Sequence, residues 1–105
     1  MIVPDVNILV YAHNESSRFH ASALAWWEDA LNGDTTILLP NICINGFIRI
    51  MTHPKILIEP LDVSEAFELV ESWLESESLS LLAPGPRHLE IYKEVLLEAG
   101  VGGKL

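Results

Sequence analysis

Residues 1–12 read MIVPDVNILVYA, and this stretch decides how the chain is interpreted. Met1 to Asp5 has the pattern of a short buried strand that ends at a carboxylate. The apolar segment from Val6 to Ala12 fits a strand or a helix, because periodicity does not separate the two in so short a run. The fold class therefore depends on the elements that follow.

A turn and a helix come next. Residues 14–17 are turn and cap residues. Leu24, Trp27 and Leu31 then repeat at helical spacing, and Gly33 is suited to end the helix. A helix is therefore predicted between this turn and Gly33.

A strand and a second helix are predicted in the middle of the chain. Residues 35–39 are β-branched and aliphatic and lie between Asp34 and Pro40, which is typical of a strand. Residues 42–51 are apolar enough for a buried helix that ends before Pro54.

The last third of the chain repeats this order. Asp62 and Glu65 resemble a capping box at the start of a helix. The apolar residues expected on one face of that helix are Val63, Ala66, Phe67, Val70, Trp73 and Leu74. A strand over residues 78–83 and a final helix from Pro86 to Gly100 follow.

Strands that alternate with helices indicate an α/β fold with a parallel sheet and helices on its faces, in a three-layer α/β/α arrangement. The chain has 105 residues, enough for one domain over residues 1–105, and half of them are apolar. We therefore expect a single folded domain without repeats or linkers.

Charge and cysteine content narrow the possible partners and compartment. The net charge is -9, so the chain as a whole repels phosphate and any contact with nucleic acid must be local or metal-mediated. Cys43 is the only cysteine, which excludes an intrachain disulfide and suits the reducing cytoplasm. The apolar start lacks a basic leader and is interrupted by Asp5, so neither a signal peptide nor a membrane span is expected.

Asp5 is the first candidate for chemistry. Ligands of parallel α/β sheets bind outside the carboxyl ends of the strands, where Asp5 is predicted to lie. Its carboxylate could hold a hard cation, and Asn7 could help to orient Asp5 or a bound water. The alternative is that Asp5 only caps the helix after it, because aspartate is frequent at helix N-termini.

The wider pattern points to one family. Its motifs are MIVPDVNILVYA at residues 1–12, His20, Trp26-Trp27, Leu39-Pro40, Gly46-Phe47-Ile48-Arg49, Thr52-His53-Pro54 and Pro84-Gly85-Pro86-Arg87-His88. In this order, from Met1 to Leu105, the chain resembles the VapC toxins of toxin-antitoxin systems, which are PIN-domain ribonucleases.

The resemblance implies a PIN fold and an endoribonuclease that cleaves RNA phosphodiesters. In the family, clustered acidic residues hold Mg2+ or Mn2+, which activates water, and a VapB-type antitoxin silences the toxin. Asp5 matches the first acid of that cluster and is the expected catalytic metal ligand, and Asn7 matches a supporting neighbour.

The sequence also departs from the family's pattern. Many relatives carry a glutamate where residues 43–49 have no acid, and the remaining family acids follow a turn like residues 102–105. The chain is therefore interpreted as an incomplete PIN domain that lacks the C-terminal strands and helices of the full fold. An apolar sheet edge beside Asp5 would then be exposed, which favours a homodimer or a complementing fragment.

Two other functions stay open at this point. A catalytically incomplete PIN fragment could act as a module that binds an antitoxin or a toxin protomer, by a helix in an apolar groove. A small flavodoxin-like regulatory domain is the other possibility, although no phosphate-binding glycine loop supports a nucleotide site.

Other reactive residue types have plainer explanations. Glutamates at four-residue spacing, Glu71 and Glu75 and then Glu90, Glu94 and Glu98, are typical of solvated helix faces. Turn or surface roles are expected for His13, His20, His53 and His88. Arg49 could contact RNA phosphate or form an ion pair within the fold. One tryptophan of each helix face should pack inward, and Cys43 should be a core residue.

Overall fold

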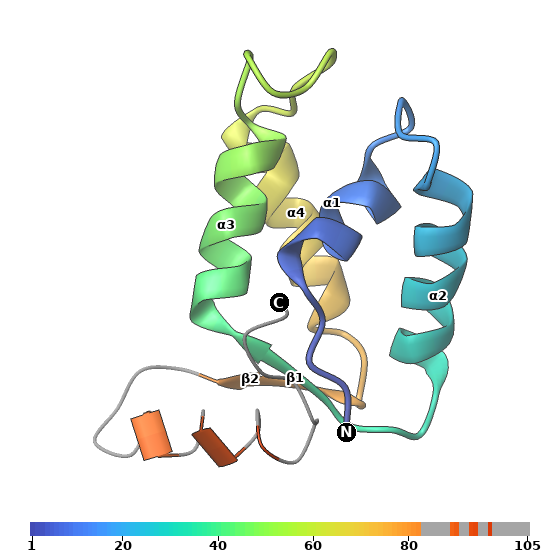
Figure 1. The fold of residues 1–105 in the computed structure, drawn as a ribbon, viewed down its shortest axis with the longest axis vertical. Coiled ribbons are helices and arrows are strands. Elements are labelled where there is room, and N and C mark those ends of the chain that lie inside the picture. Colours follow the sequence, from blue (N-terminus) through green and yellow to red (C-terminus); the bar gives the residue numbers. More distant parts are fainter. Residues whose placement is uncertain (83–88, 91–92, 95–96, 98–105) are drawn as a thin grey trace.

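The structure, a computed structural model, describes residues 1–82, 89–90, 93–94 and 97. Its elements in chain order are α1 (Val6–His13), α2 (His20–Asn32), β1 (Ile37–Pro40), α3 (Asn41–Met51), α4 (Val63–Trp73) and β2 (Leu79–Leu82). In Figure 1, α1 to α4 lie together on one side of the strands, and the helical residues 89–90 and 93–94 lie on the other. This confirms an α/β fold with helices and a parallel two-stranded sheet.

The sheet is formed by β1 and β2, which are parallel. Ile37 is opposite Leu79 and Pro40 is opposite Leu82 in their register. The chain crosses from β1 to β2 through α3 and α4, which is the helical crossover that parallel pairing requires. The predicted strands at residues 35–39 and 78–83 are confirmed, with slightly shifted ends.

The first five residues form less of a strand than predicted. Only Ile2 pairs with the sheet, through a parallel bridge to Ile37 on the side of β1 away from β2. The Ile2 amide donates to the Thr36 carbonyl, and the Leu38 amide donates to the Ile2 carbonyl, both at 2.8 Å. Pro4 has no amide hydrogen to continue the ladder, so pairing stops before it.

Helix ends follow the capping residues that the sequence shows. The segment from Val6 to Ala12, left open between strand and helix, is helical. Gly33 ends α2 as predicted. At α4 the capping box is complete, because the Glu65 amide donates to Asp62 at 2.8 Å and the Asp62 amide donates to Glu65 at 3.1 Å.

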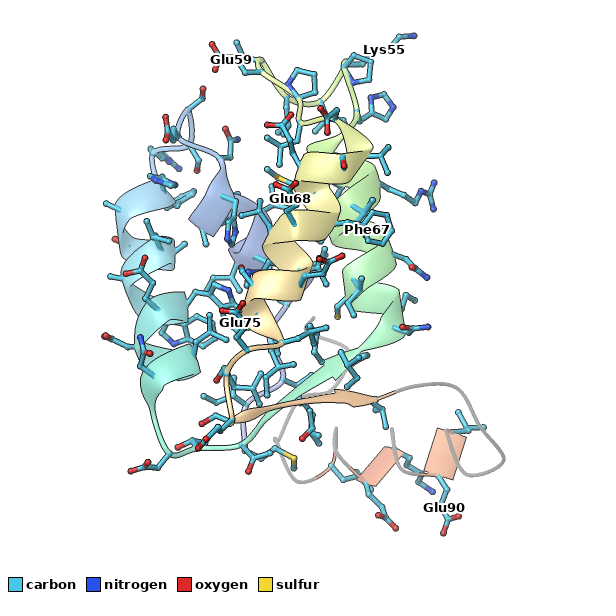
Figure 2. All side chains as sticks on the ribbon, turned by 180° about the vertical axis from the view of Figure 1, so that it is seen from behind. Lys55, Glu59, Phe67, Glu68, Glu75 and Glu90 are labelled. Atoms are coloured by element: carbon cyan, nitrogen blue, oxygen red, sulfur yellow. The ribbon has the colours of Figure 1, made fainter. Side chains whose placement is uncertain are left out.

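The buried face of α4 is narrower than predicted. Ala66, Val70 and Trp73 are buried, at a spacing of four and three residues. Val63, Phe67 and Leu74 were predicted on the same face but are 58%, 47% and 44% exposed. Figure 2 shows Phe67 on the side of α4 next to α3 and Glu68 toward its other side. A helix packed against one layer buries only a stripe of its surface.

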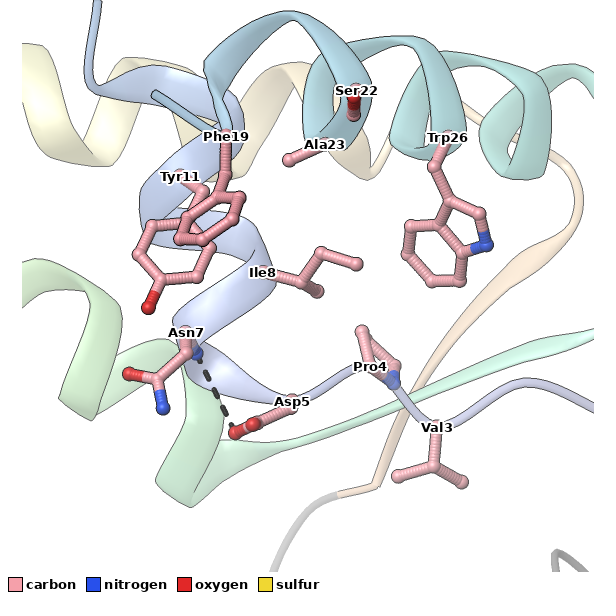
Figure 3. A pocket seen from close by; sticks show the side chains of 10 residues that line it. All are labelled: Val3, Pro4, Asp5, Asn7, Ile8, Tyr11, Phe19, Ser22, Ala23 and Trp26. Carbon is pink, nitrogen blue, oxygen red and sulfur yellow. Dashed lines mark hydrogen bonds between the residues drawn. The ribbon is translucent and has the colours of Figure 1, made fainter. Parts of the chain in front are cut away.

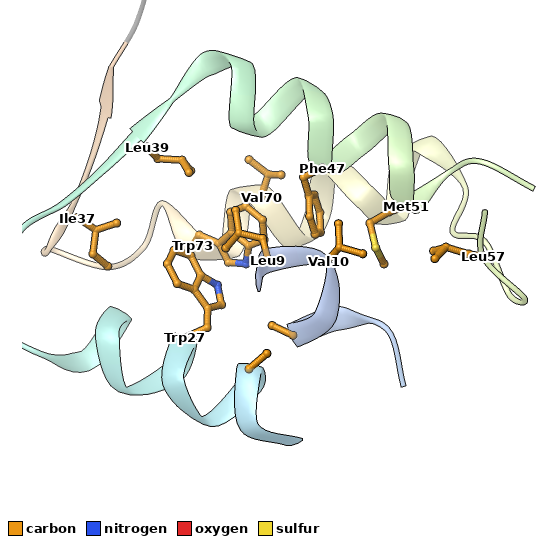
Figure 4. Close-up of a cluster of buried hydrophobic side chains, with 12 residues drawn as sticks. Leu9, Val10, Trp27, Ile37, Leu39, Phe47, Met51, Leu57, Val70 and Trp73 are labelled. Atoms are coloured by element: carbon orange, nitrogen blue, oxygen red, sulfur yellow. The ribbon is translucent and has the colours of Figure 1, made fainter. Parts of the chain in front are cut away.

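The core lies where the four helices meet above β1 (Figure 4). Its largest members are Trp27, Trp73 and Phe47, all at most 2% exposed. Trp73 forms edge-on ring contacts with Phe47, at 4.7 Å between centroids, and with Trp27, at 5.4 Å. The prediction that one tryptophan of each helix packs inward is confirmed, since Trp26 beside Trp27 is 38% exposed.

His13 is partly buried against the aromatic side chains of this core, which corrects its predicted turn or surface role. Its ring lies 5.4 Å from those of Phe47 and Trp73, and its Nδ1 is 2.8 Å from the Leu9 carbonyl oxygen. The reason is its place in the last turn of α1, where the helix crosses the aromatic cluster. Most of the predicted helix from Pro86 to Gly100 lies outside the described residues. His88 also lies outside them.

The burial of His13 leads to a prediction about stability and pH. Burial lowers the pKa of His13 below 6.5, helped by nearby His20, while the Leu9 hydrogen bond and Glu28 act in the opposite sense. The unfolded state therefore takes up a proton that the folded state resists. We expect the contribution of His13 to the free energy of unfolding to be fully present above pH 6.5 and to be lost as the pH falls below that value.

Urea unfolding at several pH values on both sides of 6.5 tests this, with His13→Gln compared against His53→Gln. His53 lies on the exposed turn after α3 and provides the matched control. The His13→Gln variant should show the shallower dependence of the free energy of unfolding on pH. Equal dependence in the two variants would contradict the role given to His13.

Candidate active site

Asp5 lies where the first chain segment ends and α1 begins. It is the N-cap of α1 with extended backbone, φ -77° and ψ 144°, and its Oδ1 accepts a hydrogen bond from the Asn7 amide at 3.5 Å. That bond is long, and both side chains are exposed. The structure therefore supports both roles considered for Asp5. Its side chain caps α1, and its exposed carboxylate is also available to a cation.

The position of Asp5 is fixed from the side of α3. The Cys43 thiol donates to the Pro4 carbonyl oxygen at 3.7 Å, and a Cβ added to Gly46 would lie 3.2 Å from Val6 Cγ2. α3 therefore packs closely against the residues on both sides of Asp5. Burial raises the pKa of the Cys43 thiol, and the nearby Asp5 carboxylate adds to the effect, so the thiol stays protonated.

An open groove of about 680 Å³ extends from Asp5 along α1 and α2 (Figure 3). Its walls are mainly apolar, and the side chains of Asp5 and Asn7 lie together at one end. The residues that line it are Val3, Pro4, Asp5, Asn7, Ile8, Tyr11, Phe19, Ser22, Ala23 and Trp26. This shape can accept an apolar or aromatic group while a charged group lies at Asp5.

The outer wall of the groove is aromatic and is held by ring contacts and a hydrogen bond between α1 and the start of α2. The Tyr11 and Phe19 rings are 5.2 Å apart, and the Arg18 guanidinium lies 4.7 Å above the Phe19 ring. The His20 Nδ1 lies 3.0 Å from the Tyr11 carbonyl oxygen, which joins the start of α2 to the end of α1. Sequence analysis predicted an apolar groove for an antitoxin helix but not the residues that line it, because Ile8, Tyr11 and Phe19 carry no local motif and meet only through the α1–α2 packing.

The comparisons with known proteins identify the family. A model of the PIN domain matches residues 2–104. The chain belongs to the PIN-domain family. It is 40% identical over 105 residues to Ribonuclease VapC33 of Mycobacterium tuberculosis, an alignment that covers all of this chain and 73% of that protein.

Two other relatives agree with this assignment. VapC ribonuclease Mb2897 of Mycobacterium bovis is 32% identical over 103 residues, which covers 98% of this chain and 70% of that protein. Ribonuclease VapC37 of Mycobacterium tuberculosis is 31% identical over 105 residues, which covers 73% of that protein. The predicted resemblance to VapC proteins is thus confirmed.

The acids of this PIN domain are dispersed over its described part. No group of three or more His, Cys, Asp or Glu side chains close enough to share a metal ion occurs in residues 1–82, 89–90, 93–94 and 97. Asp5 and Asn7 offer hard oxygen donors, the kind that Mg2+ and Mn2+ prefer, and therefore fit part of a ligand set. Glu71 and Glu75 are exposed, as expected of a solvated face, and Glu98 lies outside the described residues.

The remaining candidates lie apart from Asp5. Arg49 is exposed on α3 and lines a separate hollow with His53. Cys43 is partly buried and packs against the core of the PIN domain, close to its predicted role. In the described part of the chain, no helix is long and apolar enough to span a membrane.

Proposed function

We propose that the chain is a VapC-type toxin of a toxin-antitoxin system, a metal-dependent endoribonuclease that cleaves RNA phosphodiesters in the cytoplasm. One observation supports this most strongly. In a PIN-domain chain related to VapC ribonucleases, an exposed carboxylate, Asp5, stands at the start of α1 and at the end of an open groove.

In this proposal Asp5 is the catalytic metal ligand and Asn7 supports it. The Asp5 carboxylate and the Asn7 side-chain amide oxygen would hold Mg2+ or Mn2+ together with water. A bound divalent ion lowers the pKa of water and neutralises the charge that builds on the phosphate. The chain contributes a fixed carboxylate, because contacts from Cys43 and Gly46 on α3 hold the backbone on both sides of Asp5.

One carboxylate is too few to hold a catalytic ion firmly. We propose that residues 1–105 act as a single PIN domain that assembles as a homodimer or with a complementing segment, so that further acids join Asp5. The apolar edge predicted beside Asp5 is the surface through which this would occur.

The groove between α1 and α2 is the proposed site of a VapB-type antitoxin. Its apolar walls suit one face of an amphipathic helix. The net charge of -9 favours a basic partner, because opposite charges speed association. A partner that fills this groove would also cover the access to Asp5, which would silence the enzyme.

Cleavage of a labelled RNA pool with and without divalent ions tests the function. The folded chain should cleave RNA in Mg2+ or Mn2+, lose that activity in excess EDTA, and regain it when the metal is restored. Cleavage that persists in EDTA would contradict a metal-dependent mechanism. A folded chain that cleaves RNA neither with nor without metal would contradict the ribonuclease function and would favour the binding module described next.

That alternative is a catalytically incomplete PIN module that binds an antitoxin or a toxin protomer. It is favoured by the dispersed acids of the described residues, among which no three could share a metal ion. A pull-down with the basic antitoxin or with an intact toxin protomer decides it. Failure to retain either protein would remove this candidate.

A further inference from the structure

The surface formed by α3 and the loop after it differs in charge from the rest of the chain. Fifteen of the 105 residues are acidic, but residues 35–58, which form β1, α3 and most of the loop to α4, contain no aspartate or glutamate. The same stretch carries Arg49, His53 and Lys55. On a chain of net charge -9, it is the segment that repels phosphate least.

The basic side chains gather around one hollow. This hollow, of about 240 Å³, is lined by Gly46, Arg49, Ile50, His53 and Ile56, with no acid among them. The Lys55 amide donates to His53 Nδ1 at 3.0 Å, which sets Lys55 in the turn beside it. Arg49 and Lys55 are exposed, and among the described residues neither side chain pairs with a carboxylate. Both cations are thus available to an external anion.

At Gly46 the hollow adjoins the start of α1, next to Asp5. A Cβ at Gly46 would lie 3.2 Å from Val6, the residue after Asp5, so the start of the hollow adjoins the start of α1. Arg49 follows Gly46 by about one helical turn, and His53 by two, about 10 Å along the helix axis. A chain of phosphates that leaves Asp5 along α3 would therefore reach Arg49 and then Lys55.

The other routes from Asp5 are less favourable for a phosphate backbone. The groove along α1 and α2 is mainly apolar. The hollow on α4 is lined by Glu65 and Glu68, with Leu61, Leu69 and Ser72, and its carboxylates repel phosphate. Building on the proposed ribonuclease function, we infer that Arg49 and Lys55 on the α3 surface bind the backbone phosphates that flank the cleaved bond of a single-stranded RNA.

Binding of a labelled single-stranded RNA tests this, measured by fluorescence anisotropy in Mg2+ over a range of KCl concentrations. All samples carry Asp5→Asn so that the RNA stays intact. The variant Arg49→Gln with Lys55→Gln is compared with Lys93→Gln, which removes a positive charge from an exposed residue elsewhere. Each lost phosphate contact lowers the salt slope of log K by about 0.7 for a single strand.

We expect the Arg49 and Lys55 variant to bind several-fold more weakly, with a salt slope smaller by about 1.4, and the control variant to keep the parent slope. Equal salt slopes in the two variants, with RNA still bound, would contradict phosphate binding by the α3 surface. That result would not affect the proposed ribonuclease function. Absence of RNA binding in every sample, the Asp5→Asn parent included, would overturn the surface, while the proposed function is tested separately by the cleavage assay on the wild-type chain.

Discussion

Replacement of Trp73 by alanine is expected to remove a large part of the free energy of unfolding of this chain. Trp73 is 2% exposed at the end of α4 and contacts Trp27 from α2, Phe47 from α3 and His13 from α1. Removal of a buried tryptophan costs about 3–5 kcal/mol. Domains of this size are stable by about 5–15 kcal/mol, so the loss is a large part of the total.

Trp26→Ala provides the matched control, because Trp26 has the same side chain but is 38% exposed beside the groove. Urea unfolding followed by circular dichroism should give a loss for Trp73→Ala several times that for Trp26→Ala. The Trp73 Nε1 has no hydrogen-bond partner among the described residues, so Trp73→Phe should cost less than Trp73→Ala. Similar losses for Trp73→Ala and Trp26→Ala would show that the four helices do not depend on the Trp73 contacts.

The sequence predicted the elements better than their packing. Capping residues such as Gly33 and Asp62 act on neighbours a few positions away, so their effect can be read locally. The segment 6–12 could not be assigned, because a short apolar run fits a strand and a helix alike. The segment is helical because Asp5 caps its start and because Pro4 stops the strand pairing that began at Ile2.

The predictions that were wrong concern side chains whose burial depends on tertiary contacts. Phe67 and Trp73 both fit an apolar stripe on α4, but only Trp73 is buried among the other helices. His13 has no metal-binding or capping motif, and only the crossing of α1 over the aromatic cluster shows that it is partly buried. Apolar periodicity gives the side of a helix that faces inward, but the width of the buried stripe depends on the neighbouring helices.

The candidate site was predictable in part. Asp5 and Asn7 could be named from the first seven residues and from the resemblance, and the structure places them together at the end of a groove. The aromatic wall could not, because Tyr11 and Phe19 meet only through the packing of α1 and α2. The acid-free stretch 35–58 is visible in the sequence, but the hollow that Arg49 and His53 line is not. Whether Asp5 binds a metal or only caps α1 is still the central question.

The change Asp5→Asn separates these two roles. Asparagine caps a helix about as well as aspartate, so α1 and the stability should be preserved. The negative charge that would hold Mg2+ or Mn2+ is lost, and with it several kcal/mol of stabilisation in the transition state. We therefore expect cleavage of RNA to fall by roughly 100-fold or more without unfolding of the chain.

Asp62→Asn is the control, since Asp62 is also an aspartate N-cap, but of α4 and away from the groove. The decisive measurement is the initial rate at which the wild type and these two variants cleave one labelled RNA in Mg2+, with unfolding curves recorded on the same samples. The proposed function predicts loss of cleavage in Asp5→Asn, an unchanged rate in Asp62→Asn and three folded proteins. A folded Asp5→Asn variant that cleaves as fast as the wild type would show that Asp5 only caps α1.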